Sequence, residues 1–157
     1  MRKFIMVLLF LSPSILIGQM RENRIAPGAS LVVGKSGSLG VNLRIHYIPN
    51  DRMCIGLEAN LFPEGGELVE REFTLNAHYF FEVEELFSVY PLLGVGYEDI
   101  REENEKDGGW RALFGGGVHK NIGRFAPYAE YIYAAGFESQ GIFIIGTFYT
   151  FRIGKKE

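Results

Sequence analysis

Hydrophobic and polar positions alternate along most of the chain, most regularly between residues 86 and 98. There the odd positions are apolar and end in an aromatic residue, whereas the even positions are mostly small, polar or charged. A two-residue period of this kind indicates a β-strand with two different faces. The pattern recurs and predicts about eight strands, at residues 28–35, 39–48, 53–61, 72–81, 86–98, 110–119, 125–137 and 142–153.

Several of the polar faces also carry glycines, such as Gly94, Gly96, Gly115 and Gly117. In a soluble barrel these glycines would cover the surface that faces water. Both faces are explained if the apolar one meets lipid and the small, polar one lines a narrow lumen. Strands of about nine to eleven residues can cross a membrane when tilted, and an even number joined by hairpins can close. We therefore predict an all-β protein, an eight-stranded antiparallel up-and-down transmembrane β-barrel.

The connections between the predicted strands differ in length. The turns after the second, fourth (residues 82–85) and sixth strands are short, whereas the polar segment 62–71 and the charged segment 99–109 are predicted to be longer loops. Residues 19–27 are expected to be an irregular lead-in. Short periplasmic turns opposite longer external loops are typical of outer-membrane barrels. The loops 62–71 and 99–109 are therefore the candidates for contact with an extracellular ligand.

The first 19 residues have the parts of a secretory signal peptide. Arg2 and Lys3 precede the apolar segment 4–17, and a candidate cleavage site follows at Gly18 and Gln19. No later apolar run reaches the roughly 18 residues of a membrane helix, so insertion would have to be by strands. We expect a cleaved signal peptide at residues 1–19, export to the cell outer membrane, and a single barrel domain at residues 20–157.

Charge and cysteine content exclude two other classes of protein. Loss of Arg2 and Lys3 with the leader leaves 14 of the 16 basic residues against 19 acidic ones. An acidic chain without a basic patch argues against nucleic acid as a partner. Cys54 is the single cysteine, so this is not a disulfide-stabilised secreted domain, and we interpret Cys54 as a small filler of the lumen.

The predicted inward faces carry charged residues. An eight-stranded barrel has room only for side chains, so opposite charges are expected to pair inside it. Glu58 and Glu130 with a histidine could instead form an acid/base site, but no activated nucleophile lies beside a histidine, and His46, His78 and His119 lack metal-ligand spacing. We predict no catalytic, metal or cofactor site, and a lumen polar network of Arg44, Glu58, Glu72, Glu98, Arg111, Glu130 and Arg152.

Residues 90–97 (YPLLGVGY), 115–118 (GGGV) and 127–131 (PYAEY) resemble the small outer-membrane β-barrel family of Gram-negative bacteria, the group around the OmpA membrane domain and OmpX. The leader ending in Gly-Gln is similar to those of Bacteroidetes members. The last predicted strand is similar to the assembly signal of such barrels, with Gly146 followed by the aromatic residues Tyr149 and Phe151. The resemblance implies outer-membrane lipid as surroundings and the barrel-assembly machinery as a partner during biogenesis.

These observations predict a structural or surface-interaction role rather than a pore or an enzyme. Two alternatives stay open. A soluble lipocalin-like barrel would turn the apolar faces inward to bind a hydrophobic ligand. An outer-membrane lipid-modifying enzyme would need a catalytic set, and the sequence offers no candidate residues for one.

Overall fold

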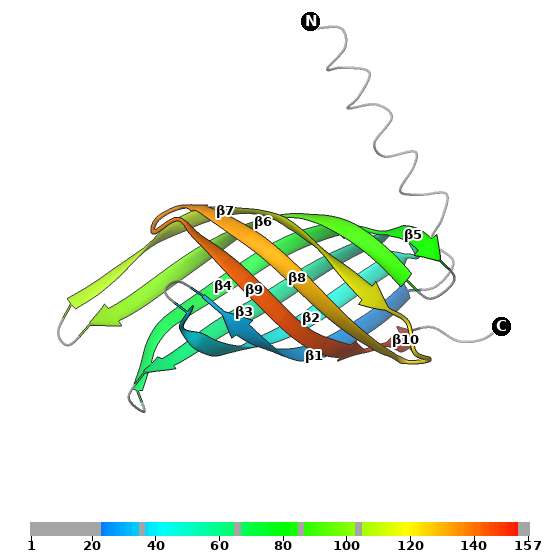
Figure 1. Cartoon of the computed structure of the whole chain (residues 1–157), viewed down its shortest axis with the longest axis horizontal. Helices are drawn as coiled ribbons and strands as arrows, with labels where there is room; N and C mark the ends of the chain where they lie inside the picture. The colour runs from blue at the N-terminus through cyan, green and yellow to red at the C-terminus, as the bar shows by residue number, and fades with distance from the viewer. Residues whose placement is uncertain (1–22, 35–36, 65–66, 85–86, 103–104, 154–157) are drawn as a thin grey trace, which may run out of the picture.

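The computed structural model describes residues 23–34, 37–64, 67–84, 87–102 and 105–153, so the predicted signal peptide lies outside the described residues. No helix in this part of the chain is long and apolar enough to cross a membrane. The described residues form one antiparallel sheet (Figure 1). Its strands are β1 (Asn23–Val33), β2 (Leu39–Asn50), β3 (Met53–Glu64), β4 (Glu67–Tyr79), β5 (Phe81–Glu84), β6 (Phe87–Glu102), β7 (Glu105–Lys120), β8 (Phe125–Gly136), β9 (Gln140–Tyr149) and β10 (Phe151–Ile153).

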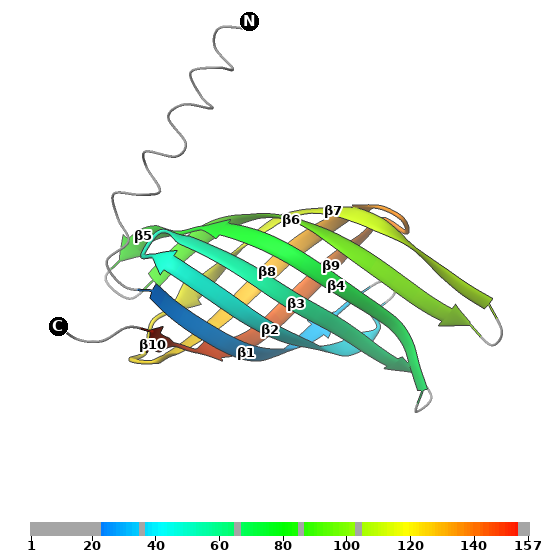
Figure 2. The same cartoon turned by 180° about the vertical axis from the view of Figure 1, so that it is seen from behind.

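The sheet closes into a barrel because β1 pairs with β9, for example Ser30 with Gly146. Two short strands continue longer ones: β5 extends β4 along β6, and β10 extends β9 along β1. The break before β5 falls at Phe80, whose backbone N–H donates to Arg52 O over 2.8 Å, and the break before β10 falls at Thr150. The described residues therefore form a closed barrel of eight antiparallel strands, as the sequence predicted (Figure 2).

Side chains alternate between the two faces of the barrel wall as the two-residue pattern requires. Along β2 the odd positions from Leu39 to Tyr47 are exposed, and the even positions from Gly40 to Ile48 are buried. The apolar residues thus form an outer belt and the polar residues face the interior. This arrangement contradicts the lipocalin-like alternative, which places the apolar faces inside.

The height of the apolar belt can be worked out along β6. Its outward residues are apolar or aromatic from Phe87 to Tyr97, and Asp99 follows. Ten steps of about 3.4 Å at a tilt of about 40° span about 26 Å, close to the roughly 25 Å apolar band of a membrane barrel. Where the belt ends, Arg71 Nε of β4 donates to Asp99 Oδ2 of β6 over 2.7 Å. The outer surface therefore changes from apolar to charged at the height expected of a membrane boundary.

Several predicted connections are strands instead. β1 begins at Asn23 rather than at residue 28, and most of β5 falls in the predicted turn 82–85. The predicted loops 62–71 and 99–109 are mostly strand, because β3–β4 and β6–β7 continue pairing to Glu64↔Glu67 and Glu102↔Glu105. Outside the belt a hairpin needs only its own cross-strand hydrogen bonds, so pairing continues after the apolar alternation stops. Figure 1 shows both hairpins reaching beyond the barrel at the same end.

Candidate functional site

The interior is organised around Arg44, which reaches across the lumen from β2 to β8. Its two terminal nitrogens donate to both carboxylate oxygens of Glu130, over 2.8 and 2.9 Å. Arg44 Nη2 also lies 3.2 Å from Glu58 Oε2 on β3. All three side chains are buried, and the guanidinium lies over the ring of Tyr128, 4.4 Å from its centroid. A bidentate pair of this kind fixes two strands that are not neighbours in the sheet against each other across the lumen.

A second ion-pair cluster lies around Arg111 of β7. Its guanidinium donates to Glu98 of β6, and its Nε lies 3.5 Å from Glu72 Oε1 of β4. Gln140 of β9 donates to Glu98 over 3.2 Å. These charged side chains are also buried. Each guanidinium is therefore shared between two carboxylates.

Two asparagines join the clusters. Asn42 Nδ2 lies 3.1 Å from Glu58 Oε2 and 2.7 Å from Asn60 Oδ1, and Asn60 Nδ2 donates to Glu72 Oε2 over 2.9 Å. Strand register brings these residues together, because Asn42 lies opposite Asn60 and Asn60 opposite Glu72. A continuous polar chain therefore runs through the interior from Glu130 to Glu98. Burial of so many charges is tolerated only because each carboxylate lies beside a guanidinium or a hydrogen-bond donor.

Six of the seven residues predicted for the lumen polar network point inward and take part in it. Arg152 lies on the same face of the wall, opposite Arg24 in the β1–β10 register, but it is exposed at the rim, beyond the buried part of the interior. The two linking asparagines were missed by the sequence prediction, which counted charged residues only. The sequence did contain a signal for them, because both are uncharged polar side chains at inward positions of neighbouring strands.

The proposed acid/base alternative gains no support from the geometry. Glu58 and Glu130 share Arg44, and His46 Nε2 lies 3.4 Å from Glu58 Oε1. These side chains are almost wholly buried, with Glu58 5% and Glu130 2% exposed. A carboxylate held in an ion pair and shielded from solvent is placed to neutralise charge rather than to act on a substrate.

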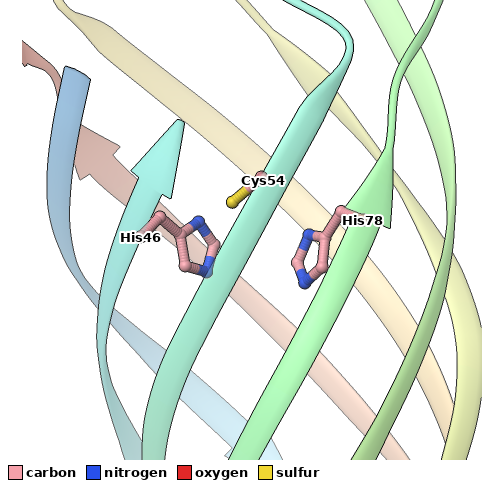
Figure 3. Close-up of side chains that lie close together, drawn as sticks. All are labelled: His46, Cys54 and His78. Carbon is pink, nitrogen blue, oxygen red and sulfur yellow. The ribbon is translucent and has the colours of Figure 1, made fainter. Parts of the chain in front are cut away.

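Aromatic and histidine side chains fill the interior near the short turns. The His78 ring stacks on Tyr90 with centroids 5.2 Å apart, and the His46 ring lies 5.1 Å from His78 and 5.7 Å from Phe148. Cys54 lies directly opposite His78 in the β3–β4 register. Ligand atoms of His46, Cys54 and His78 all lie within 4.8 Å of one another, and Figure 3 shows the Cys54 sulfur between the two imidazole rings.

The reasoning that led to the prediction of no metal site did not consider a cluster of this kind. The sequence argument looked for ligand spacing along one segment, but these three residues come from β2, β3 and β4. Spacing along the chain does not measure proximity across strands. The sequence did contain a signal for this cluster. His46 and Cys54 occupy inward positions on either side of the tight turn between β2 and β3, and His78 occupies an inward position of β4, which pairs with β3.

The three residues predicted to form an assembly signal lie around the closing seam. Gly146 faces the interior, and a Cβ there would lie only 2.3 Å from Ser30 Cβ of β1 and 2.6 Å from Ala29 O. Glycine is therefore required for β9 to approach β1 at this position. Tyr149 and Phe151 lie on the outer face in contact with each other, and Tyr149 also contacts Phe125.

A closed eight-stranded barrel with an outer apolar belt and a lumen occupied by paired charges has the fold of the small outer-membrane β-barrels. No protein-family model and no curated protein sequence matches the chain. Solved structures do match. The N-terminal β-barrel domain of Pseudomonas aeruginosa OprF has a TM-score of 0.69 at 17% sequence identity, over 83% of this chain and 98% of that one.

Two further solved structures have the same architecture. Ail, the attachment invasion locus protein of Yersinia pestis, solved in complex with the heparin analogue sucrose octasulfate, has a TM-score of 0.58 at 21% identity, over 83% of this chain and 98% of that one. Neisserial surface protein A has a TM-score of 0.60 at 13% identity, over 83% and 97%. At these identities the likeness concerns the fold.

Proposed function

We propose that this protein is an outer-membrane barrel with a closed, cross-braced interior, which presents its two long hairpins at the cell surface and acts neither as a pore nor as an enzyme. The Arg44–Glu130 pair carries this proposal, because it crosses the lumen between β2 and β8, which are not neighbours in the sheet. An eight-stranded barrel leaves an interior just wide enough for side chains. The apolar belt supports outer-membrane lipid as its surroundings.

The proposed orientation puts the short turns in the periplasm and the hairpins β3–β4 and β6–β7 outside. It is supported by the position of both described ends of the chain, Asn23 and Ile153, which pair with each other at the short-turn end. Export through a signal peptide at residues 1–19 would deliver the chain to the periplasmic side. The hairpin regions 62–71 and 99–109 are then the surfaces through which an extracellular ligand would bind.

Cysteine labelling tests this orientation. Asp107 on the β6–β7 hairpin and Arg124 beside a short turn are both exposed, whereas the native Cys54 is 1% exposed and should label slowly. We expect a membrane-impermeant maleimide to label Asp107→Cys in intact cells and Arg124→Cys only after lysis. The opposite pattern would contradict the orientation. Recovery of the unmodified protein in the soluble periplasmic fraction would contradict the outer-membrane location.

We further propose that Gly146, Tyr149 and Phe151 act as a signal for the barrel-assembly machinery. The double variant Tyr149→Ala/Phe151→Ala should fold in lipid vesicles but insert poorly in cells. The matched control is Phe81→Ala/Phe87→Ala, which removes two exposed aromatics from the same end of the barrel on β5 and β6. Equal insertion of the two double variants in cells would show that β9 and β10 carry no special signal.

A further inference from the structure

The cluster of His46, Cys54 and His78 has the composition of a metal centre. Cysteine thiolate and histidine nitrogen are the ligands that zinc prefers, and three protein ligands with one open position form a known class of zinc site. The three residues are 1–3% exposed and belong to three adjacent strands. We propose that they bind one divalent transition-metal ion of the zinc class inside the barrel.

The surroundings of the two histidines fit this role. His46 Nε2 lies 3.4 Å from Glu58 Oε1, which leaves Nδ1 of the same ring for the ion. A carboxylate on the far nitrogen of a metal-binding histidine is a common arrangement, since it orients the ring and raises its basicity. His78 Nε2 is buried without a hydrogen-bond partner among the described residues. A rotation of the ring that brings this nitrogen to the ion would give it a partner that the protein itself does not supply.

The charges next to the cluster favour a divalent ion. Arg44 faces two buried carboxylates, Glu58 and Glu130, so one negative charge is left over beside the cluster when His46 is neutral, as it must be to bind a metal ion. A divalent ion bound to the Cys54 thiolate and two neutral imidazoles carries one net positive charge. It would therefore balance the excess carboxylate, which a monovalent ion on the same thiolate would leave uncompensated.

The cluster also lies close to the barrel opening at the short-turn end. A pocket of about 80 Å³ there is lined by residues that include Phe80, His119 and Phe148. Phe148 also contacts the His46 ring, and the Phe80 ring lies 6.3 Å from that of His78. The two phenylalanines thus separate the pocket from the cluster, and their movement would give an ion a path inward.

Only a small adjustment is needed for binding. Ligand atoms around tetrahedral zinc lie roughly 3.5 Å apart, given bonds of about 2.0–2.3 Å. The three ligand atoms lie within 4.8 Å of one another, so they would have to approach by little more than about 1 Å. Rotation of the two imidazole side chains supplies movement on this scale.

The test uses untagged protein folded in detergent micelles, with folding checked by its shifted mobility on an unboiled gel. We expect one tightly bound zinc per chain. Cobalt, which takes the place of zinc, should produce the near-ultraviolet charge-transfer absorption of a cobalt–thiolate bond. Because Cys54 is the single cysteine, this absorption in the unaltered protein already assigns the thiolate. A folded protein that takes up no zinc, or that binds cobalt without the absorption, overturns the proposal.

Variants then test whether the metal ion binds at this cluster or elsewhere on the protein. Cys54→Ala should abolish the cobalt–thiolate absorption, and His78→Gln should weaken zinc binding at least tenfold. His119→Gln is the matched control, a buried lumen histidine outside the cluster, and should bind as the unaltered protein does. Phe148→Ala should speed zinc uptake. Unchanged zinc affinity in both Cys54→Ala and His78→Gln, or Cu(I) binding with no zinc binding, contradicts the assignment.

Discussion

The Arg44–Glu130 pair offers the sharpest test of how the interior stabilises the barrel. Arg44→Met removes the guanidinium but keeps most of the side-chain volume, and it leaves the carboxylates of Glu58 and Glu130 buried beside each other. Glu130 would keep the Tyr90 hydroxyl, which donates to it over 2.8 Å, and Glu58 would keep the Asn42 amide. Breaking a buried ion pair from one side costs about 3–5 kcal/mol. We expect a loss of unfolding free energy in this range.

The partner substitution should cost less. Glu130→Gln keeps an acceptor for Arg44, which also retains its pair with Glu58. The loss of one charged hydrogen-bonding partner is worth about 1.5–3 kcal/mol. Because Arg44 and Glu130 contact each other directly, the double variant should lose less than the sum of the two single changes, with a coupling of about 1–3 kcal/mol.

Urea unfolding in lipid vesicles measures these differences, with the fluorescence of the single tryptophan, Trp110, as the signal. Trp110 is 72% exposed on the outer face, so its emission should report transfer from lipid to water. Arg24 and Asp51 form the control pair at the rim, where the Asp51 side chain is 82% exposed. Each rim substitution should cost less than about 1 kcal/mol. Additive effects at Arg44 and Glu130, no larger than those at the rim, would refute cross-bracing by the interior.

Three further outcomes follow from the same geometry. Leu43→Arg, at mid-height on the lipid face, should cost about 2–4 kcal/mol in vesicle unfolding, whereas Leu39→Arg near the strand end should cost clearly less; equal losses would contradict the assigned belt. Gly146→Val should prevent or strongly slow refolding, measured by gel mobility, because its Cβ would lie 2.3 Å from Ser30 Cβ. Gly37→Ala should be milder, because nothing lies within 4 Å of its Cβ position and the only cost is that of a side chain at a positive φ of 81°, about 1–2 kcal/mol. Planar-bilayer recordings of the unaltered protein should show no stable conductance steps, because Arg44 and Glu130 span the lumen.

The sequence alone was enough to predict the architecture. Side chains on a strand alternate with a period of exactly two residues, so each run of alternating residues states which positions face inward and which face outward. This is why the outward positions of β2, from Leu39 to Tyr47, are those the pattern predicted. Antiparallel hairpins pair neighbours in sequence, which is why the strand order and the closure of eight strands could also be predicted.

Where the strands end was predicted poorly. The alternation reports contact with lipid and lumen, and it stops where the chain enters water. Cross-strand hydrogen bonding does not stop there, so 62–71 and 99–109 were predicted as loops although β3–β4 and β6–β7 remain paired. The alternation was also extended to Arg152, which was therefore assigned to the lumen network although it lies past the point at which the buried interior ends.

Only the tertiary structure decided which inward residues meet. The contact of Arg44 with Glu130 joins residues 86 positions apart, and it depends on the tilt and stagger with which the sheet closes. The cluster of His46, Cys54 and His78 depends in the same way on the register of three strands. The periodicity of the sequence shows that a side chain points into the barrel. Which side chains it meets there depends on how the sheet closes, because closure brings together strands that are far apart in the sequence.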